Sequence, residues 1–406
     1  MPRTTSGHRF NSTTGFRPHL DDIPPRRRRI IFFRQGKFSH TNENVVTWLR
    51  EQFPEEELVQ IDVLQEVIKS SRVVVYLAAA AALKTYLRRI VLEGQEFRDM
   101  YYKTPYLFRA VRRLIGQKYA ELAKTCLFSI QTQSLYDASI PGLPHFLYTD
   151  HTHLANLRYP GVTRAQLSTP AWIELERSIY HRVRMNLVMS EFVRDSLIED
   201  YGCEPSRIAV VGAAPNVPPP DAVPDNANYS NQVILFVGID WERKGGPYLV
   251  EAFRKVSAQV PGAKLVIAGS TPKIDLPNVQ VLGRVPRPEV SRLLLESSVL
   301  ALPSLREPQG MIAIEALAHG IPVVATNVGA LPEAVEDGKC GRIIPPCDSL
   351  ALADALIDLI SDPAKCRKYG EAGRESARAR YYAESVSQRM GEAIRAGLAE
   401  PAGARR

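Results

Sequence analysis

Residues 299–315 read VLALPSLREPQGMIAIE, and the order of residue types in this stretch decides the fold expected for the second half of the chain. An apolar run ends at Pro303, a loop rich in proline and glycine follows, and a second apolar run begins after Gly310. This order predicts a short buried strand, a loop and a helix. Glu307 then falls on the loop beside backbone amides, and Glu315 falls inside the helix. Such a layout suits a ligand that carries both hydroxyls and phosphates.

Strands and helices alternate outward from this stretch through most of the chain. Strands are predicted over residues 29–33, 58–64, 126–130, 146–149, 186–190, 208–211, 233–237, 265–268, 279–282, 299–302, 323–325 and 342–344. Helices are predicted near residues 42–52, from Pro105, over residues 172–184, from Pro247, after the Asp348 cap, and over residues 383–398. The alternation indicates an α/β fold with doubly wound parallel sheets.

The length and composition of the chain indicate two domains. A chain of 406 residues with 45% hydrophobic content is too long for one typical core. We expect a disordered basic tail over residues 1–28, an N-terminal domain over 29–216, a linker over 217–232, a C-terminal domain over 233–380, and a final helix and tail over 381–406. That helix could cross back to the first domain. Ligands are expected in a cleft between the domains, because open parallel sheets bind them at the carboxyl ends of their strands.

The charge and apolar content exclude several classes of protein. The formal net charge is +7, but the first 30 residues alone hold seven Arg and two Asp, so the basicity is mostly a tail and no nucleic acid partner is expected. The longest apolar run, Val73–Leu83, is too short for a bilayer span and is interpreted as a buried element. The five widely spaced cysteines are interpreted as reduced thiols, which fits a cytoplasmic protein.

Two segments raise the question of a peripheral contact with the inner face of a membrane. The run Arg26–Arg29 could contact anionic lipid, although a disordered tail without such a contact is the favoured interpretation. The helix within residues 101–118 mixes aromatic side chains with Arg112 and Arg113. Packing against the core is favoured over a lipid interface for this helix. If the acceptor is lipid-linked, we expect the membrane to touch the chain here.

An anion site is predicted where the second sheet ends. Gly310 allows a ligand to approach the backbone, and the N–H groups of Met311 and Ile312 at the helix start favour a phosphate. The loop that Gly238 opens reads GIDWERKGG over residues 238–246 and brings Arg243 and Lys244 to the same sheet edge. A lysine at this place can neutralise a diphosphate, although a solvated turn is the alternative.

These residues resemble the large family of retaining glycosyltransferases with the GT-B fold, often called family four, over residues 207–385 and more loosely before. The family's two glutamates separated by seven residues appear as Glu307 and Glu315, and its Lys-Gly pair appears as Lys244 and Gly245. The resemblance implies two Rossmann-like domains that face a cleft. It also implies that Glu307 contacts the donor sugar, Glu315 the ribose and Lys244 the diphosphate.

The resemblance extends to further donor-binding positions, with one departure. The turn that contains Arg284 and Val285 is similar to the one whose main chain meets the nucleobase. Many relatives place an arginine directly after the first glycine of the Gly238 loop, where this chain has Ile239. Arg243 is the candidate replacement, and the alternative is that its side chain points to solvent.

The N-terminal domain offers three further candidates. Asp150 and His151 follow a predicted strand, where the family often has a histidine near the reacting carbon. A metal held by His151 and His153 is the alternative, but no third ligand has suitable spacing, so no metal or other cofactor is expected. Gly36 resembles a glycine of the family's acceptor loop.

The resemblance implies a retaining hexosyltransferase that uses a UDP- or GDP-sugar and a glycan or lipid-linked acceptor. Glu307, Lys244 and His151 are its predicted catalytic residues. Two alternatives stay open from the sequence. A nucleotide-sugar epimerase would convert the donor without an acceptor, and an inactive nucleotide-sugar-binding protein would bind the donor without transferring it. Phosphorylases of this fold that use pyridoxal phosphate are considerably longer.

Overall fold

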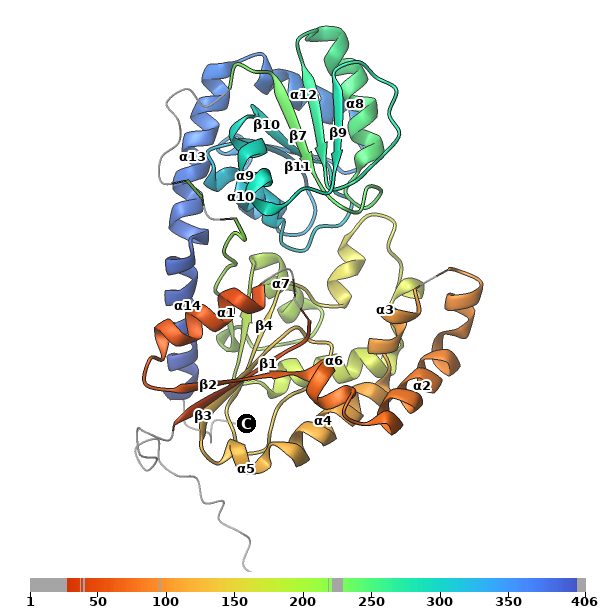
Figure 1. Ribbon diagram of the computed structural model, residues 1–406, viewed down its shortest axis with the longest axis vertical. Helices are drawn as coiled ribbons and strands as arrows, with labels where there is room; N and C mark the ends of the chain where they lie inside the picture. The colour runs from red at the N-terminus through yellow and green to blue at the C-terminus, as the bar shows by residue number, and fades with distance from the viewer. Residues whose placement is uncertain are drawn as a thin grey trace, which may run out of the picture.

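The computed structural model describes residues 28–36, 38, 41–94, 96–217, 219–220 and 229–399. The basic tail expected over residues 1–28 lies outside the described residues except for Arg28, and so do residues 221–228 of the expected linker. Figure 1 shows two α/β units stacked along the long axis of the molecule, with the helices α13 (Pro363–Tyr381) and α14 (Ala383–Ala399) running along one side of both.

The N-terminal unit is built on a six-stranded parallel sheet in the order β2-β1-β3-β4-β5-β6. Its strands are β1 (Arg29–Arg34), β2 (Glu57–Asp62), β3 (Cys126–Thr132), β4 (His145–Thr149), β5 (Met185–Val188) and β6 (Ile208–Val210). Its helices include α1 (Thr41–Gln52), α2 (Arg72–Val91), α3 (Phe97–Tyr102), α4 (Pro105–Lys118), α5 (Ala120–Ala123), α6 (Pro170–Arg182) and α7 (Glu191–Glu199). The strand order reverses between β1 and β3.

The C-terminal unit is built on a second six-stranded parallel sheet in the order β12-β11-β10-β7-β8-β9. Its strands are β7 (Val233–Val237), β8 (Lys264–Ala268), β9 (Val279–Gly283), β10 (Val299–Leu302), β11 (Val323–Thr326) and β12 (Gly341–Ile344). Its helices are α8 (Gly246–Gln259), α9 (Arg287–Leu295), α10 (Met311–Ala318), α11 (Leu331–Val335), α12 (Ser349–Ile360) and α13. The two sheets confirm the predicted α/β class. The order of the second sheet reverses between β7 and β10, the place where such sheets bind ligands.

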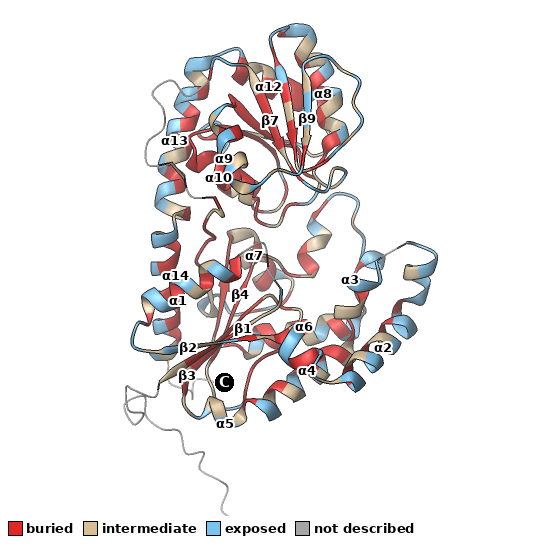
Figure 2. Ribbon diagram, viewed as in Figure 1, coloured by how far each residue is buried: buried red, intermediate tan, exposed pale blue. Residues whose placement is uncertain are grey.

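Apolar side chains cover both faces of the second sheet. Leu249 and Phe253 of α8 pack with Leu352 and Leu356 of α12 in one buried cluster. The apolar helix α10 belongs to a second cluster together with β10 and β11. Figure 2 shows the strands of this sheet largely as buried residues between partly exposed helices. The predicted Asp348 cap is confirmed, because its carboxylate accepts the N–H of Ala351 at 2.8 Å.

Helix α14 packs against the N-terminal sheet, although it follows the C-terminal domain in sequence. Val386, Met390 and Ile394 are buried in the core cluster that contains Phe32 and Phe146. The amide of Gln52 on α1 donates to Ser387 Oγ at 3.2 Å. This helix therefore connects the two units mechanically as well as covalently.

Three expectations about the N-terminal unit change in detail. The strand expected over residues 58–64 ends at Asp62, because that carboxylate accepts the N–H of Gln65 and starts a π-helix over Val63–Ile68. Helix α4 buries Leu107, Phe108, Val111 and Ile115, so the core-packed interpretation of the 101–118 helix is confirmed. The interpretation of residues 73–83 as a buried element is wrong in part. They lie in α2, of which only one face is buried.

The described residues contain no helix that is long and apolar enough to cross a membrane.

Candidate active site

The central contact of the candidate site joins the loops after β7 and β10, the two strands at the switch point of the second sheet. Lys244 Nζ donates a short hydrogen bond to Glu307 Oε2, and Ser304 Oγ donates to the same oxygen at 3.1 Å. The Lys244 and Glu307 side chains are both nearly buried, with 12% and 9% exposed. The loop that carries Glu307 is anchored by Thr326, whose hydroxyl donates to Ser304 O at 2.6 Å. Lys244 and Glu307, which the sequence predicts at the same sheet edge, are therefore in direct contact.

Arg243 also turns toward this cluster. Its Nη1 donates to the carbonyl oxygen of Arg306 at 2.7 Å and lies 3.9 Å from Glu307 Oε2, while its Nε donates to Asp240 at 3.1 Å. The Ile239 side chain is 67% exposed. The structure thus places a guanidinium near Glu307 from position 243 rather than 239, on a side chain that remains 36% exposed.

Close backbone approach requires glycine at several positions of the site. A Cβ atom on Gly245 would lie 1.8 Å from the Pro303 carbonyl oxygen, and one on Gly329 would lie 1.7 Å from the Glu307 carbonyl oxygen. A Cβ on Gly238 would lie 2.9 Å from Lys244 Cγ, so the absence of a side chain there makes room for the lysine. These contacts give a packing reason for Gly238 and Gly245, which the sequence predicted at the donor site, and for Gly329.

Helix α10 begins at this cluster. Gly310 is the N-cap residue directly before the helix, and its φ of 74° lies in the left-handed region. Ile312 is buried, and Met311 packs against core residues of both units. The first N–H groups of an α-helix have no acceptor within the helix, and they favour anions. The Met311 and Ile312 amides are thus the predicted anion seat, next to Glu307.

Glu315 is buried on the same helix, and the junction to the N-terminal unit supplies its partner. Its Oε1 accepts the N–H of Asn216 at 3.0 Å. Burial raises the pKa of the Glu315 carboxyl to about 7, whereas the N–H of Asn216 and the charge of Arg287 act in the opposite direction. The cationic Arg287 at the start of α9 was not singled out from the sequence, since nothing local distinguishes it from other surface arginines.

We expect the pH dependence of stability to report this carboxyl. A folded-state pKa raised to about 7 means that the folded protein holds a proton that the unfolded chain has released, so the stabilisation is present at low pH and is lost as pH rises through 7. Between about pH 6.5 and about pH 8.5 the loss should be about 1 kcal/mol. Urea denaturation of wild type and Glu315→Gln at both pH values tests this. A variant with an undiminished pH dependence would contradict the assignment.

Asp150 and His151 lie beyond the end of β4, on the side of the N-terminal unit that faces Glu307. Burial raises the pKa of Asp150 to about 6, and the negative charge of Glu307 adds to that rise. Burial lowers the pKa of His151 to about 4, so its imidazole is neutral near pH 7. Neither buried ring nitrogen of His151 has a hydrogen bond of good geometry within the described structure, although the nearby Asn156 side chain partly offsets the lowering of the pKa. The imidazole is thus placed to bond with a ligand.

An aromatic stack holds the His151 ring. Its centroid lies 5.6 Å from the ring of Tyr159 and 6.1 Å from that of Phe192, both in stacked geometry. Tyr159 belongs to the N-terminal chain segment but packs in a core cluster of the C-terminal unit, and its buried hydroxyl has no partner among the described residues. Burial raises the pKa of the Tyr159 hydroxyl, and the negative charges of Glu307 and Asp150 raise it further. Sequence reasoning missed Tyr159 because its position follows from the docking of the two units.

The remaining predicted residues have different surroundings. His153 is not free for a metal, because its Nε2 accepts the N–H of Ser168 at 2.8 Å, and no cluster of three metal-binding side chains exists in the described part of the chain. Gly36 has φ of 59° after β1, and its carbonyl accepts from Asn42 at 2.8 Å. Arg284 is exposed beyond β9, two strands from β7, so the structure does not bring its side chain into the Lys244 cluster. Val285 next to it packs against the core.

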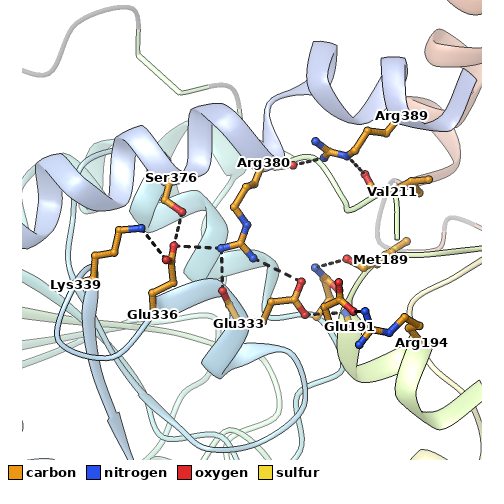
Figure 3. A network of polar contacts seen from close by, with 11 residues as sticks. Met189, Glu191, Arg194, Val211, Glu333, Glu336, Lys339, Ser376, Arg380 and Arg389 are labelled. Carbon is orange, nitrogen blue, oxygen red and sulfur yellow. Dashed lines mark hydrogen bonds and ion pairs between the residues drawn. The ribbon is translucent and has the colours of Figure 1, made fainter. Parts of the chain in front are cut away.

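A polar network fixes the two units against each other near the site (Figure 3). Glu333 on α11 accepts the N–H of Glu191, the first residue of α7, at 2.8 Å. Arg380 on α13 donates to the Glu333 carbonyl oxygen at 3.0 Å and to Glu336 at 3.2 Å. Arg389 on α14 donates to the Val211 carbonyl oxygen at 3.0 Å. These bonds help to fix the orientation of the N-terminal unit, which carries His151, relative to the C-terminal unit, which carries Glu307.

Comparison with known families agrees with this arrangement. Residues 223–376 match the family described as glycosyl transferases group 1. The C-terminal domain is a group 1 glycosyl transferase domain. The two glutamates, Lys244 and the start of α10 all lie within the matched range of this glycosyl transferase domain.

Curated relatives match part of the chain. The alpha-maltose-1-phosphate synthase of Mycolicibacterium smegmatis is 27% identical over 241 residues, which is 50% of this chain and 60% of that protein. The MMP alpha-(1->4)-mannosyltransferase of Mycolicibacterium hassiacum is 29% identical over 220 residues, with coverages of 51% and 52%. The chain thus matches little more than half the length of these relatives.

Solved structures match nearly the whole chain in fold. Sucrose-phosphate synthase from Thermosynechococcus elongatus has a TM-score of 0.65 at 17% identity and covers 91% of this chain and 99% of its own. HepE from Anabaena, solved with UDP-glucose, has a TM-score of 0.61 at 17% identity with the same coverages. The glycosyl transferase domain and the N-terminal unit together therefore form the GT-B fold.

Proposed function

We propose that this protein transfers a hexosyl group from a UDP- or GDP-sugar to a glycan or lipid-linked acceptor, with retention of the anomeric configuration. The observation that carries the proposal is the contact of Lys244 with Glu307 at the switch point of the C-terminal sheet, beside the start of α10. The position combines a cation and free helix amides for a diphosphate with carboxylates for sugar hydroxyls. The named transferase and synthase relatives, and HepE with its bound UDP-glucose, support the same class of donor.

Each side chain has a role that its surroundings support. Lys244, Arg243 and the α10 amides stabilise the charge that develops on the leaving diphosphate, which is the main catalytic contribution. Glu307 accepts hydrogen bonds from the donor sugar, and Glu315 accepts them from the ribose. His151, whose neutral ring lacks a hydrogen bond of good geometry within the described structure, bonds to a sugar hydroxyl near the reacting carbon. The departing diphosphate takes the acceptor proton on the same face of the sugar.

The diphosphate is the ligand group that distinguishes this site from a general nucleotide pocket. We expect UDP or GDP, and the matching nucleotide sugar, to raise the melting temperature, because a ligand present at about 100 times its Kd adds about 2.7 kcal/mol. UMP and GMP are the matched controls. They keep the base and ribose but lack the second phosphate that Lys244 would hold, so their shift should be much smaller.

A transfer assay with the stabilising donor then separates the proposal from its alternatives. Donor loss that requires an added acceptor supports the transferase. Conversion of the donor to an isomeric nucleotide sugar without acceptor would identify an epimerase. Saturable binding with no consumption across a panel of glycan and lipid-linked acceptors would favour an inactive binding protein. Equal stabilisation by monophosphates and diphosphates would contradict the assignment of Lys244.

A further inference from the structure

Helix α2 and the residues just after it carry most of the large exposed apolar side chains of the described residues. Eight of the eleven large apolar side chains that are exposed there belong to residues 73–97. Four of them are at least 66% exposed, namely Val73, Tyr76, Val91 and Leu92. Figure 2 shows α2 at the edge of the N-terminal unit, with long exposed stretches on its outer side. A patch of this extent on a folded protein indicates an interaction surface.

Helix α2 has two apolar faces, and the described residues cover only one of them. Val74, Ala78, Ala82 and Tyr86 are buried at i, i+4 spacing. At about 100° per residue, the six exposed side chains of the helix occupy an arc of about 120° on the opposite side. These six are Val73, Tyr76, Leu77, Leu83, Leu87 and Val91, and we call them the outer stripe.

The inner face holds the helix firmly in place. Tyr86 donates its hydroxyl to the Lys103 carbonyl oxygen at 2.7 Å. Arg89 donates to the Leu167 carbonyl oxygen, also at 2.7 Å, from the same end of the helix. The outer stripe is thus presented on a fixed support of about 30 Å in length.

The chain segment that carries the outer stripe is strongly basic, and three of its cations lie on the stripe itself. Residues 69–118 hold eleven Lys or Arg and three Asp or Glu, a net charge of +8, compared with +7 for the whole chain. Helix α2 itself contains no acidic residue. Arg72 and Arg88 fall at the two edges of the stripe and Lys84 within it, and all three are exposed. The surface therefore matches a partner that is both apolar and anionic.

We infer that the outer stripe docks on a membrane surface that contains anionic lipid, with α2 lying in the plane of the headgroups. Such helices place apolar side chains below the headgroups and cations beside the phosphates. Lys84 reaches the phosphates by extending its stem along the apolar surface, and Tyr76 suits the boundary between the two regions. A second copy of the chain fits this surface less well, because two copies of α2 would bring only cations together.

Vesicle sedimentation with the full chain tests the inference independently of any transfer activity. Wild type should sediment with vesicles of equal parts phosphatidylcholine and phosphatidylglycerol, and much less with phosphatidylcholine alone. The triple variant Leu77→Ser, Leu87→Ser, Val91→Ser should lose most of the binding. The triple variant Arg72→Gln, Lys84→Gln, Arg88→Gln should weaken it about a hundredfold, since each cation near the surface contributes about fivefold.

Matched controls separate this surface from the basic N-terminal tail, which every variant retains. Leu350→Ser removes a leucine that is 65% exposed on α12, and Arg254→Gln removes an exposed cation on α8. Both should bind vesicles as wild type does. All variants should keep the wild-type melting temperature, because the changed side chains are exposed. Unchanged vesicle binding by both α2 variants would overturn the inference, as would loss of a dimer in the serine variant without loss of vesicle binding.

Discussion

Replacing Lys244 with alanine is expected to lower the turnover of glycosyl transfer by about a hundredfold to a thousandfold at saturating donor. The ammonium group lies in a nearly buried position against Glu307, where a charge interacts more strongly than it does in water. In the proposed mechanism it faces the donor diphosphate, whose negative charge grows as the bond to the sugar breaks. The measurement is steady-state turnover with the donor identified by thermal shift.

Two further variants make this result interpretable. Removing Lys244 leaves the Glu307 carboxylate with Arg243 at 3.9 Å and the Ser304 hydroxyl, which reduces its stabilisation. Lys244→Gln keeps a hydrogen-bond donor for Glu307 without the charge, and it should lose turnover to a similar extent. Lys255→Ala is the control. It removes a lysine of α8 that pairs with the exposed Asp354 of α12, and its turnover should match that of wild type. Wild-type turnover in a folded Lys244→Ala protein would contradict the assignment of Lys244 to the leaving diphosphate.

Alanine at Gly245 is expected to destabilise the C-terminal domain by about 4 kcal/mol or more, with loss of donor binding. Gly245 has φ of 74°, and a Cβ there would lie 1.8 Å from the carbonyl oxygen of Pro303. Neither backbone segment can move without displacing Lys244 or Glu307. The melting temperature should fall by about 10 °C or more for a domain of this size.

Two other glycines with the same φ of 74° provide a matched series. A Cβ on Gly338 has no atom within 4 Å, so Gly338→Ala reports only the cost of the left-handed backbone, about 1 kcal/mol. A Cβ on Gly310 would lie 2.5 Å from Leu331 Cδ2, the end of a side chain that can move, so its cost should be intermediate. Equal melting temperatures for the three variants would show that backbone conformation, and not packing, requires glycine at position 245.

Much of the candidate site follows from short-range sequence patterns. The strand that ends before Pro303 and the helix that begins after Gly310 are confirmed, and with them the loop position of Glu307 and the helical position of Glu315. The turn that contains Lys244 and Gly245 has the same origin, because an apolar run and adjacent glycines mark where a strand ends. Each of these features depends on residues within one element and its flanking loop.

The same local sequence patterns did not show how the helices and strands pack against one another. The sequence could not show that Tyr159 enters a core cluster of the other unit, or that Glu333 accepts the N–H of Glu191. Nor could it show the direction of Arg243, which depends on a carbonyl group 63 residues away. Contacts of this kind join segments distant in the chain, and no local period encodes them.

The sequence by itself determined the alternation of strands and helices and the chemistry at the end of each strand, because hydrophobic periodicity and turn residues act locally. Only the tertiary structure decided that β7 and β10 are neighbours, which brings Lys244 onto Glu307. It also decided which of the two apolar faces of α2 is covered. The physical reason is the same in both cases. A local pattern fixes which side chains an element offers, whereas the packing of distant segments fixes which of them find a partner.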